Sequence, residues 1–285
     1  MKKLKIAIQK SGRLNEDSLR LLKDCGISIS NGADSLMAYS PDFPIEILYL
    51  RNSDIPQYVR DGVADVAIIG SNTEYEKNTG NRIVMSLGFS RCRVSLAVPR
   101  DVQYNGPEYF NGKKIATSYP RTLQVFLDEK GIDAQIHCIS GSVEIAPSIG
   151  LADGICDIVS SGSTLLKNGL KETDRVLESE AVLVASPILE DEKQCLLDNL
   201  VFRIKSVLSA RNNKYIMLNA PASSLEEICG ILPGKKSPTI MPLQKEGWVS
   251  IHSVVSESKF WEVIGRLKEA GAEDILVLPI EKMIF

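Results

Sequence analysis

The chain has 285 residues, which is enough for two or three domains with a sizeable core. Hydrophobic residues make up 44% and charged residues 24%, and the formal net charge of −3 argues against a general nucleic-acid or membrane surface. No apolar run approaches the ~20 residues that span a bilayer, and the apolar run near the N-terminus is too short for a signal peptide.

The cysteines and histidines indicate a cytoplasmic protein without a metal centre of its own. The six cysteines include no CxxC pair. Cys25, Cys138 and Cys156 sit within or beside apolar runs, so we expect reduced core or near-core thiols. The two histidines, His137 and His252, fall in strand-like runs with no motif around them, so neither a catalytic triad nor a zinc site is predicted.

The first part of the chain alternates short apolar strands with helices, which is typical of a parallel α/β unit. Strands are predicted at 5–8, 45–50 and 65–69, and helices at 15–25 and 54–62. The carboxyl ends of such strands share one rim, where ligands gather. The residues that this rule places on the rim are Lys10, Arg51, Gly70, Ser71 and Asn72.

A polar glycine turn, QKSGR from Gln9 to Arg13, follows the first strand. Lys10 and Arg13 in this turn are candidates for charge-assisted hydrogen bonds to phosphates. The alternative is a solvated turn without a ligand. Arg51 is equally open to a helix cap or a plain surface charge.

A second α/β lobe is predicted after the strand at 91–99, which we interpret as a crossover between lobes. Further strands are expected at 113–117 and 134–139, a helix at 119–129, and a return to the first lobe over 175–185. Two lobes joined by two crossings are the design of a hinged, type II periplasmic-binding-protein-like cleft, although the pattern by itself indicates only two α/β lobes. Ser118, Tyr119 and Arg121 precede a helix and form a second possible phosphate site.

The stretch from Gly141 to Leu165, GSVEIAPSIGLADGICDIVSSGSTL, carries the strongest functional signal. A strand is predicted at 151–159, then the small-residue loop SSGST, then a helix that begins near Leu165. Small side chains let backbone N–H groups reach a phosphate at a helix start, and the hydroxyls add donors. Asp157 and Glu144 are acids near this loop, and Asp157 suits ribose hydroxyls or a water of Mg²⁺. The alternative is an ordinary capped turn.

The C-terminal part has a different pattern. A long helical stretch is predicted at 190–210, and from 214 onward the order of elements is βαββαβ, which is typical of a ferredoxin-like module. No catalytic cluster is visible in this module. We interpret it as a small-molecule sensor or an oligomer contact, with a purely structural domain as the alternative.

Several motifs together resemble the ATP phosphoribosyltransferase family. The stretch from Gly141 to Leu165 resembles its phosphoribosyl-pyrophosphate (PRPP) motif. The other motifs that resemble the family are IAIQKSGRL at 6–14, ATSYPRTLQVFL at 116–127, KSPTIMPL at 236–243 and ILVLPIEKM at 275–283. The last of these resembles the long form, which carries its own regulatory domain.

The resemblance implies an α/β fold with a two-lobed, type II periplasmic-binding-protein-like catalytic part and a C-terminal ferredoxin-like βαββαβ regulatory domain. The divisions we expect are 1–92 with 184–211 for catalytic lobe I, 93–183 for lobe II with the PRPP loop, and 212–285 for the regulatory domain.

The resemblance also implies the reaction. N1 of ATP attacks C1′ of PRPP, which gives N1-(5-phosphoribosyl)-ATP and pyrophosphate in the first step of histidine biosynthesis. The implied cofactor is Mg²⁺, held mainly by pyrophosphate oxygens and water, so no protein ligand is assigned. Histidine is the implied feedback inhibitor, and the implied assembly is a homo-oligomer that passes from dimer to hexamer. No nucleic-acid or membrane partner is expected.

The residues implied for each role can be given in turn. The catalytic residues are Asp157, Glu144 and Lys10. The PRPP-binding residues are Asp157, Ser160, Ser161, Gly162, Ser163, Thr164 and Leu165. The ATP-binding residues are Lys10, Gly12, Arg13, Leu14, Arg51, Gly70, Arg93 and Tyr119. The histidine-binding residues are Asn219, Ser237, Pro238, Thr239 and Ile240.

The sequence can be compared with three other functions. A non-catalytic two-lobed solute sensor lacks support because the sequence shows no export signal and no helix-turn-helix. A phosphoribosyltransferase for another base commonly has paired acids before its loop, whereas here Asp157 is followed by Ile158 and Val159. A catalytically dead regulatory subunit would be expected to lose the loop, which is intact.

Overall fold

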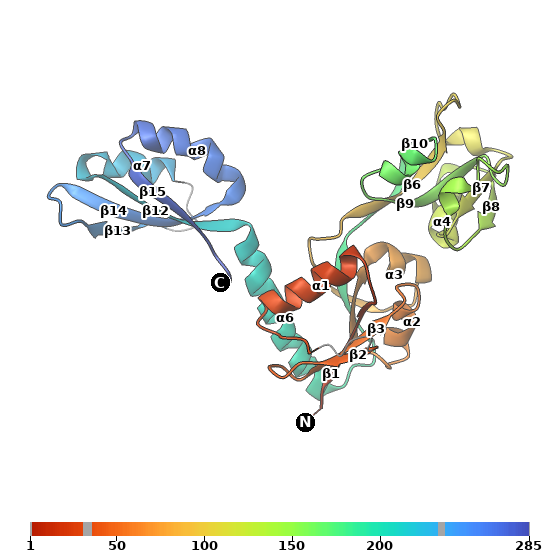
Figure 1. Cartoon of the computed structure of the whole chain (residues 1–285), viewed down its shortest axis with the longest axis horizontal. Coiled ribbons are helices and arrows are strands. Elements are labelled where there is room, and N and C mark those ends of the chain that lie inside the picture. The colour runs from red at the N-terminus through yellow and green to blue at the C-terminus, as the bar shows by residue number, and fades with distance from the viewer. Residues whose placement is uncertain (1, 31–35, 233–236, 285) are drawn as a thin grey trace. The chain divides into compact units, whose positions relative to one another are not determined.

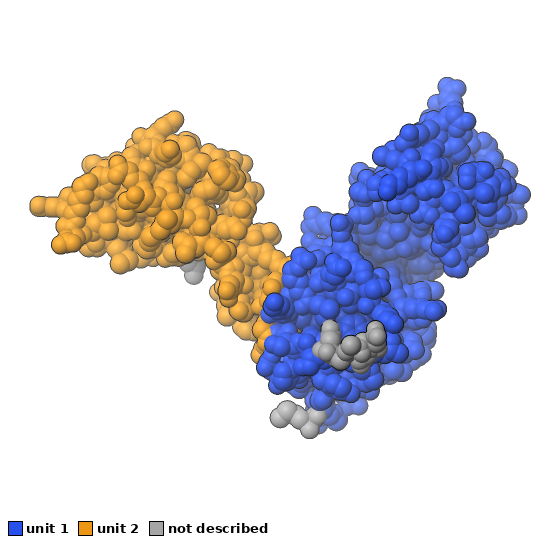
Figure 2. All heavy atoms as spheres, in the orientation of Figure 1, with its two compact units in different colours: residues 1–23, 27–197 blue, residues 24–26, 198–285 orange. Residues whose placement is uncertain are grey.

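The computed structural model describes residues 2–30, 36–232 and 237–284. They form two compact units, coloured separately in Figure 2. Unit 1 comprises residues 1–23 and 27–197, and unit 2 comprises residues 24–26 and 198–285.

The first sheet of unit 1 has the strand order β2-β3-β1-β4-β11-β5. Its strands are β1 (Leu4–Gln9), β2 (Met37–Tyr39), β3 (Ile45–Leu50), β4 (Val66–Gly70), β5 (Arg82–Ser86) and β11 (Ala181–Ala185). β1 pairs in parallel with β3 and β4, whereas β11 runs antiparallel between β4 and β5. The helices that follow these strands are α1 (Arg13–Asp24), α2 (Ile55–Arg60) and α3 (Ser71–Lys77).

The central strands of this sheet are apolar on both faces. Ile6, Ala7 and Ile8 of β1 are fully buried, and Val66 to Ile69 of β4 are at most 1% exposed. Strands covered on both sides lose the alternation of polar and apolar residues and become continuous hydrophobic runs. The burial therefore explains why these segments were recognisable as strands of a parallel sheet.

The second sheet of unit 1 has the order β10-β6-β9-β7-β8. Its strands are β6 (Cys92–Pro99), β7 (Lys114–Thr117), β8 (Gln135–Cys138), β9 (Gly154–Val159) and β10 (Leu170–Ser179). β7 pairs in parallel with β8 and β9, and β6 runs antiparallel to β9 and β10. The helical segments are η1 (Pro107–Phe110), α4 (Pro120–Lys130), η2 (Val143–Ile145) and α5 (Ser163–Lys167).

Both sheets share one topology. In each, the three mutually parallel strands stand in the order second, first, third, as β3-β1-β4 in the first sheet and β8-β7-β9 in the second, and a strand that has just crossed from the other sheet follows antiparallel. The crossing strand is β11 in the first sheet and β6 in the second. This arrangement of two α/β sheets with exchanged strands confirms the type II periplasmic-binding-protein-like fold.

Some predicted boundaries are wrong. The return to the first sheet is made by β11 alone, because residues 175–179 belong to β10 and pair with β6. The strand predicted at 151–159 begins only at Gly154, and the helix after the loop begins at Ser163 rather than near Leu165. Cys25 and Cys156 are buried as expected, but Cys138 at the end of β8 is exposed.

Unit 2 contains one four-stranded antiparallel sheet in the order β13-β14-β12-β15. Its elements after α6 (Asp191–Arg211) are β12 (Asn213–Pro221), η3 (Ala222–Ser224), α7 (Leu225–Ile231), β13 (Thr239–Pro242), β14 (Trp248–Ser256), α8 (Glu257–Glu269) and β15 (Glu273–Pro279). α7 and α8 cover one face of the sheet (Figure 1), where Ile228 and Leu267 pack against Ile216 and Ile251. The order confirms the ferredoxin-like βαββαβ domain. Within the described residues, no helix has the length and apolarity needed to cross a membrane.

A buried ion pair secures the start of α6 to the first sheet. Lys193 Nζ lies 2.7 Å from Asp65 Oδ1, and the two side chains are only 18% and 6% exposed. Asp65 Oδ2 also accepts a hydrogen bond from the backbone N–H of Lys5 at 2.8 Å. The carboxylate therefore joins the start of β1, the turn before β4 and the first turn of α6.

We expect Asp65→Asn to lower the free energy of unfolding by about 2–4 kcal/mol, because it leaves the part-buried Lys193 ammonium without its counter-charge. Equilibrium urea unfolding measures this change. Asp61→Asn, on an exposed residue four positions earlier, is the matched control and should change the free energy by less than about 0.5 kcal/mol. Equal effects of the two substitutions would contradict the assignment.

Candidate active site

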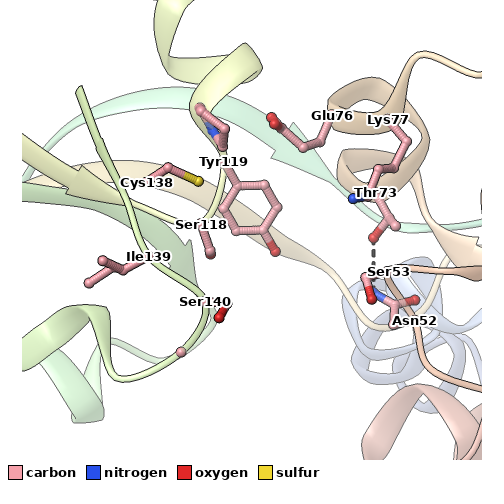
Figure 3. Close-up of a pocket in the computed structure, with 12 residues that line it drawn as sticks. Asn52, Ser53, Thr73, Glu76, Lys77, Ser118, Tyr119, Cys138, Ile139 and Ser140 are labelled. Carbon is pink, nitrogen blue, oxygen red and sulfur yellow. Dashed lines mark hydrogen bonds between the residues drawn. The ribbon is translucent and has the colours of Figure 1, made fainter.

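Three cavities in unit 1 are linked by shared lining residues, the third adjoining both of the others, and together they are called the cleft below. The first, of about 420 Å³, is lined by residues of both sheets, with Asn52 and Thr73 on one side and Ser118, Tyr119 and Ser140 on the other (Figure 3). The second, of about 280 Å³, surrounds the small-residue loop. The third, of about 350 Å³, shares Asn52 with the first and Ser160 with the second.

The second cavity collects most of the residues that the sequence assigned to PRPP. Its lining comprises Cys92, Glu144, Asp157, Ile158, Val159, Ser160, Ser161, Gly162, Thr164 and Leu165. Asp157 comes from β9 and Glu144 from the short turn η2, which is thirteen residues earlier in the chain. The fold therefore brings the two predicted acids to one cavity with the loop, while Ser163 faces its neighbour Ser161, with 3.1 Å between the hydroxyl oxygens.

The loop conformation depends on Gly162. This residue is the N-cap of α5 and has a φ of +77°, in the left-handed region that a side chain disfavours. The chain can therefore turn sharply from β9 into α5. The first N–H groups of a helix have no partner within it, so those of Thr164 and Leu165 are oriented for an acceptor at the cavity.

Asp157 is partly buried and is held by a hydrogen bond. Ser118 Oγ donates a hydrogen bond to Asp157 Oδ1 at 3.2 Å. Burial raises the pKa of Asp157, and the nearby Glu144 adds to the rise, whereas the bonds from the Ile158 N–H and Ser118 partly offset it. The Asp157 carboxylate is thus a fixed hydrogen-bond acceptor. Hydrogen bonds donated by a ligand would stabilise its ionised form.

The first sheet contributes the turn after β1. Arg13 Nη1 lies 3.5 Å from Ser160 Oγ, and Arg13 and Leu14 line the third cavity together with Gln9 and Gly70. The turn is pinned by Asn15, whose side-chain amide donates to the Gln9 carbonyl at 2.6 Å. Lys10, Gly12 and Arg51 are exposed and are not among the residues that line these three cavities.

Gly70 allows a close approach at the end of β4. A Cβ atom at this position would lie 2.3 Å from Asn72 Oδ1. The glycine therefore leaves room for the buried Asn72 side chain, which accepts a hydrogen bond from Ser179 Oγ at 2.8 Å and donates one to the Tyr119 hydroxyl at 3.1 Å. Gly70 therefore gives space to a neighbouring side chain and also lines the third cavity.

Arg93 already has a carboxylate partner. Its guanidinium donates to both carboxylate oxygens of Glu172, and its Nη1 donates to the Ser160 carbonyl at 3.2 Å. The pairing holds the pKa of Glu172 below its usual range. Arg93 therefore orders the start of the loop, and its predicted role in ATP binding stays a prediction.

The second possible phosphate site, at the start of α4, is wrong. The backbone N–H groups of Arg121 and Thr122 donate to the Glu76 carboxylate at 3.0 Å and 2.8 Å, so the first turn of α4 already holds an anion. Tyr119, which precedes the helix, does line the first cavity. Burial raises the pKa of the Tyr119 hydroxyl well above its ordinary value.

The predicted histidine-binding residues lie in unit 2. Asn219 is on β12, and its side-chain amide donates to Asp274 Oδ2 at 3.1 Å. Thr239 and Ile240 begin β13, the exposed edge strand, and Ser237 and Pro238 lead into it. Lys236, the first residue of the KSPTIMPL motif, lies outside the described residues.

Several cleft residues were not recognised from the sequence. Asn52 joins two cavities and donates to Thr73 Oγ1 at 3.0 Å (Figure 3). Cys92 and Arg91, at the first crossing between the sheets, also line the cleft. The position of Asn52 just after β3 was the available signal, because the carboxyl ends of parallel strands share a rim. The places of Cys92 and Arg91 in the cleft depend on how the chain crosses between the sheets, and no motif around them in the sequence indicated those places.

Comparison with known proteins identifies the family. The family model described as ATP phosphoribosyltransferase matches residues 51–206. An ATP phosphoribosyltransferase of Cytophaga hutchinsonii is 57% identical over 281 residues, covering 99% of this chain and 98% of the relative. That of Bacteroides thetaiotaomicron is 55% identical, with 99% of each chain covered. The chain belongs to the ATP phosphoribosyltransferase family.

The match extends to the C-terminal unit. A second family model, described as the HisG C-terminal domain, matches residues 210–282, so this is the long form of ATP phosphoribosyltransferase. A solved structure described as an ATP phosphoribosyl transferase (HisG:HisZ) complex from Thermotoga maritima is 31% identical with a TM-score of 0.59. It covers 71% of this chain and 98% of its own, and the similarity supports the same two-sheet fold in the catalytic part.

Within the parts of the chain that the structure describes, no group of three or more His, Cys, Asp or Glu side chains is arranged to hold a metal ion. Asp157 and Glu144 are the carboxylates at the loop cavity. Two carboxylates fit a Mg²⁺ ion that keeps most of its ligands from phosphate oxygens and water.

The burial of Asp157 predicts a pH-dependent stability difference. Because the folded protein holds this proton more tightly than the unfolded chain, ionisation of Asp157 destabilises the fold at pH values above its raised pKa. Asp157→Asn keeps an acceptor for Ser118 and removes that charge. We therefore expect the variant to have a higher urea midpoint than wild type at pH 8, with the difference shrinking toward pH 4.

Urea unfolding at both pH values measures this difference. Asp128→Asn, an exposed aspartate at the end of α4, serves as the control and should give no such pH dependence. If Asp157→Asn is less stable than wild type at pH 8, the ionised carboxylate is stabilised by its surroundings and the account is wrong.

Proposed function

We propose that this chain transfers the 5-phosphoribosyl group of PRPP to N1 of ATP, which gives N1-(5-phosphoribosyl)-ATP and pyrophosphate in the first step of histidine biosynthesis. The observation that carries the proposal is the second cavity, where Asp157 and Glu144 meet the Ser160–Leu165 loop in a member of this family. An uncharged donor loop for a phosphate beside acceptors for ribose hydroxyls is what a bound phosphoribosyl group requires.

The donor half of the reaction is assigned to the second sheet. Backbone N–H groups and hydroxyls from Ser160 to Leu165 hold the 5-phosphate, with the turn at Gly162 setting their direction. Asp157 and Glu144 accept hydrogen bonds from the ribose hydroxyls. Arg93, fixed by Glu172, keeps the Ser160 carbonyl in place. These groups position the sugar so that C1′ faces the cleft.

The acceptor half is assigned to the adjoining cavities. Arg13, Leu14, Gly70 and Tyr119 line them, so ATP would lie along this part of the cleft. Lys10, Gly12 and Arg51 are exposed, and each is next in sequence to a residue that lines the third cavity. They would contact the polyphosphate tail at the rim of the cleft. Lys10 is the weakest of the proposed catalytic residues, because its side chain lines none of the three cavities.

Displacement at C1′ builds positive charge on the sugar and negative charge on the leaving pyrophosphate. The protein therefore contributes through positioning and electrostatic complementarity rather than a nucleophilic side chain. Mg²⁺, when bound, supplies charge neutralisation on the pyrophosphate oxygens. Asp157 and Glu144 would reach that ion only through water or through the sugar hydroxyls that they hold.

The regulatory and cellular assignments extend the same proposal. We assign histidine as a feedback inhibitor that binds unit 2 through Asn219, Ser237, Pro238, Thr239 and Ile240. The second family model, which covers this unit, supports the assignment. We further propose a cytoplasmic homo-oligomer that passes from dimer to hexamer when histidine binds.

The reaction is tested with ATP, PRPP, Mg²⁺ and pyrophosphatase, following the purine absorbance and identifying the product by mass spectrometry. Wild-type protein should form the N1-substituted adenine product only with both substrates. Asp157→Asn should lower kcat/KM by about 100-fold or more, because it removes the charged acceptor for the ribose hydroxyls. Asp128→Asn should remain at wild-type activity.

Other outcomes have defined meanings. If product forms with a different base but not with ATP, the assignment of the PRPP loop stands and the identity of the acceptor is wrong. No product with any base would contradict the proposal and favour a non-catalytic cleft.

Histidine inhibition is tested in the same assay. Histidine should suppress turnover, and Asn219→Ala should raise the inhibitory concentration about tenfold, the effect of losing about 1.4 kcal/mol of binding free energy. Ser258→Ala, at an exposed hydroxyl on α8 in the same unit, should retain wild-type inhibition. Inhibition that is identical in wild type and Asn219→Ala would remove Asn219 from the histidine site.

A further inference from the structure

Helix α4, which follows β7 of the second sheet, is capped by a side chain of helix α3, which follows β4 of the first sheet. Tyr119, at its N-cap position, makes no side-chain capping bond. Instead, Glu76 of α3 accepts hydrogen bonds from the Arg121 and Thr122 backbone N–H groups at 3.0 Å and 2.8 Å and from Thr122 Oγ1 at 2.7 Å. A carboxylate at a helix N-terminus satisfies orphan donors and faces the positive end of the helix dipole.

Two more contacts join the same two elements. The Arg121 guanidinium donates to the Tyr75 carbonyl of α3, and the Asn72 amide donates to the Tyr119 hydroxyl at 3.1 Å. Asn72 is itself held by Ser179 Oγ at 2.8 Å. Three residues of α3, Asn72, Tyr75 and Glu76, therefore hold the start of α4, with the carboxylate of Glu76 making the largest set of bonds.

The held segment leads directly to the donor site. Ser118 and Tyr119 come just before α4, and Ser118 donates to Asp157 while Tyr119 lines the first cavity. Glu76 lines that cavity too, next to Tyr119 in Figure 3. Glu76 of α3 thus fixes the end of this segment at Arg121 and Thr122, and Asp157 of β9 fixes the end at Ser118.

We propose that Glu76 is a positioning residue for the transfer reaction: by capping α4, it sets the placement of the acceptor side of the cleft against the phosphoribosyl side. The inference rests on the proposed function above. It assigns Glu76 a role through hydrogen bonds between α3 and α4 and not as a group that takes part in the chemistry.

The local alternative is that Glu76 merely stabilises α4. The two roles differ in what they change. The loop residues and both acids of the PRPP site lie on η2, on β9 and on the loop into α5, so loss of the Glu76 bonds reaches that site only through Ser118. A positioning role therefore affects ATP and turnover, whereas a local stabilising role lowers the fraction of folded protein.

The test is Glu76→Gln, which keeps one acceptor oxygen but presents an NH₂ group to a helix donor. We expect kcat to fall about tenfold and KM for ATP to rise, while KM for PRPP stays within about twofold of wild type. Calorimetric titration with PRPP alone counts competent sites, so that kcat refers to folded protein. Glu129→Gln, an exposed glutamate at the other end of α4, is the matched control and should behave as wild type.

Hydrogen–deuterium exchange provides a readout that does not need activity. Glu76→Gln should accelerate exchange in the peptide covering the first turn of α4 about tenfold, and Glu129→Gln should leave it unchanged. If Glu76→Gln folds poorly, Thr122→Val removes a single bond to the carboxylate and should show smaller changes in the same direction.

Three results would overturn the inference. The first is unchanged kcat and exchange in Glu76→Gln, and the second is a kcat that recovers fully once competent sites are counted. The third is an equal loss of affinity for PRPP and ATP. A wild-type chain without any transfer activity would instead defeat the proposed function, and exchange would then still show whether Glu76 holds α4.

Discussion

The two crossings of the chain between its sheets constrain every group in the cleft. β6 runs antiparallel beside β9 and pairs Ser95 with Asp157, and β11 runs antiparallel beside β4 and pairs Ala181 with Gly70. β9 and β4, which both end at the cleft, are therefore each hydrogen-bonded to a strand arriving from the other sheet. Because the crossings are part of both sheets, the donor and acceptor sides of the cleft share one backbone framework.

That framework lets the protein use short, neutral groups for its chemistry. The loop after β9 offers backbone N–H groups and hydroxyls, and the acids beside it, Asp157 and Glu144, accept rather than attack. Displacement at an anomeric carbon needs reactants that are aligned and charge that is balanced, and it needs no activated nucleophile. The buried carboxylate and the constrained loop are consistent with that division of labour.

The sequence predicted those features that are encoded locally. The small-residue loop after an apolar strand, with Asp157 near its end, is a short-range pattern, and so is the βαββαβ order of unit 2. The two-lobed arrangement also followed from the alternation of strands and helices. In each case the residues that carry the information are neighbours in the chain.

The features that could not be predicted depend on distant partners. Glu76 meets Thr122 across 46 positions, and Arg93 meets Glu172 across 79. Nothing around these residues distinguishes a charged side chain that binds a ligand from one that binds its own protein, which is why Arg93 and the start of α4 were assigned to phosphates. The split between β10 and β11 was missed for a similar reason, because only Glu180 separates the two strands and what changes is the pairing partner.

The pairing of cleft arginines with carboxylates has a consequence for how the protein meets anions in solution. Arg93 is bound to Glu172, and Arg91 Nε lies 3.7 Å from Glu180. The charge of these two arginines is therefore compensated at short range. Long-range attraction of polyanions scales with uncompensated charge and is screened by salt. At these two positions, an anion would meet the geometry of close hydrogen bonds rather than a free positive charge.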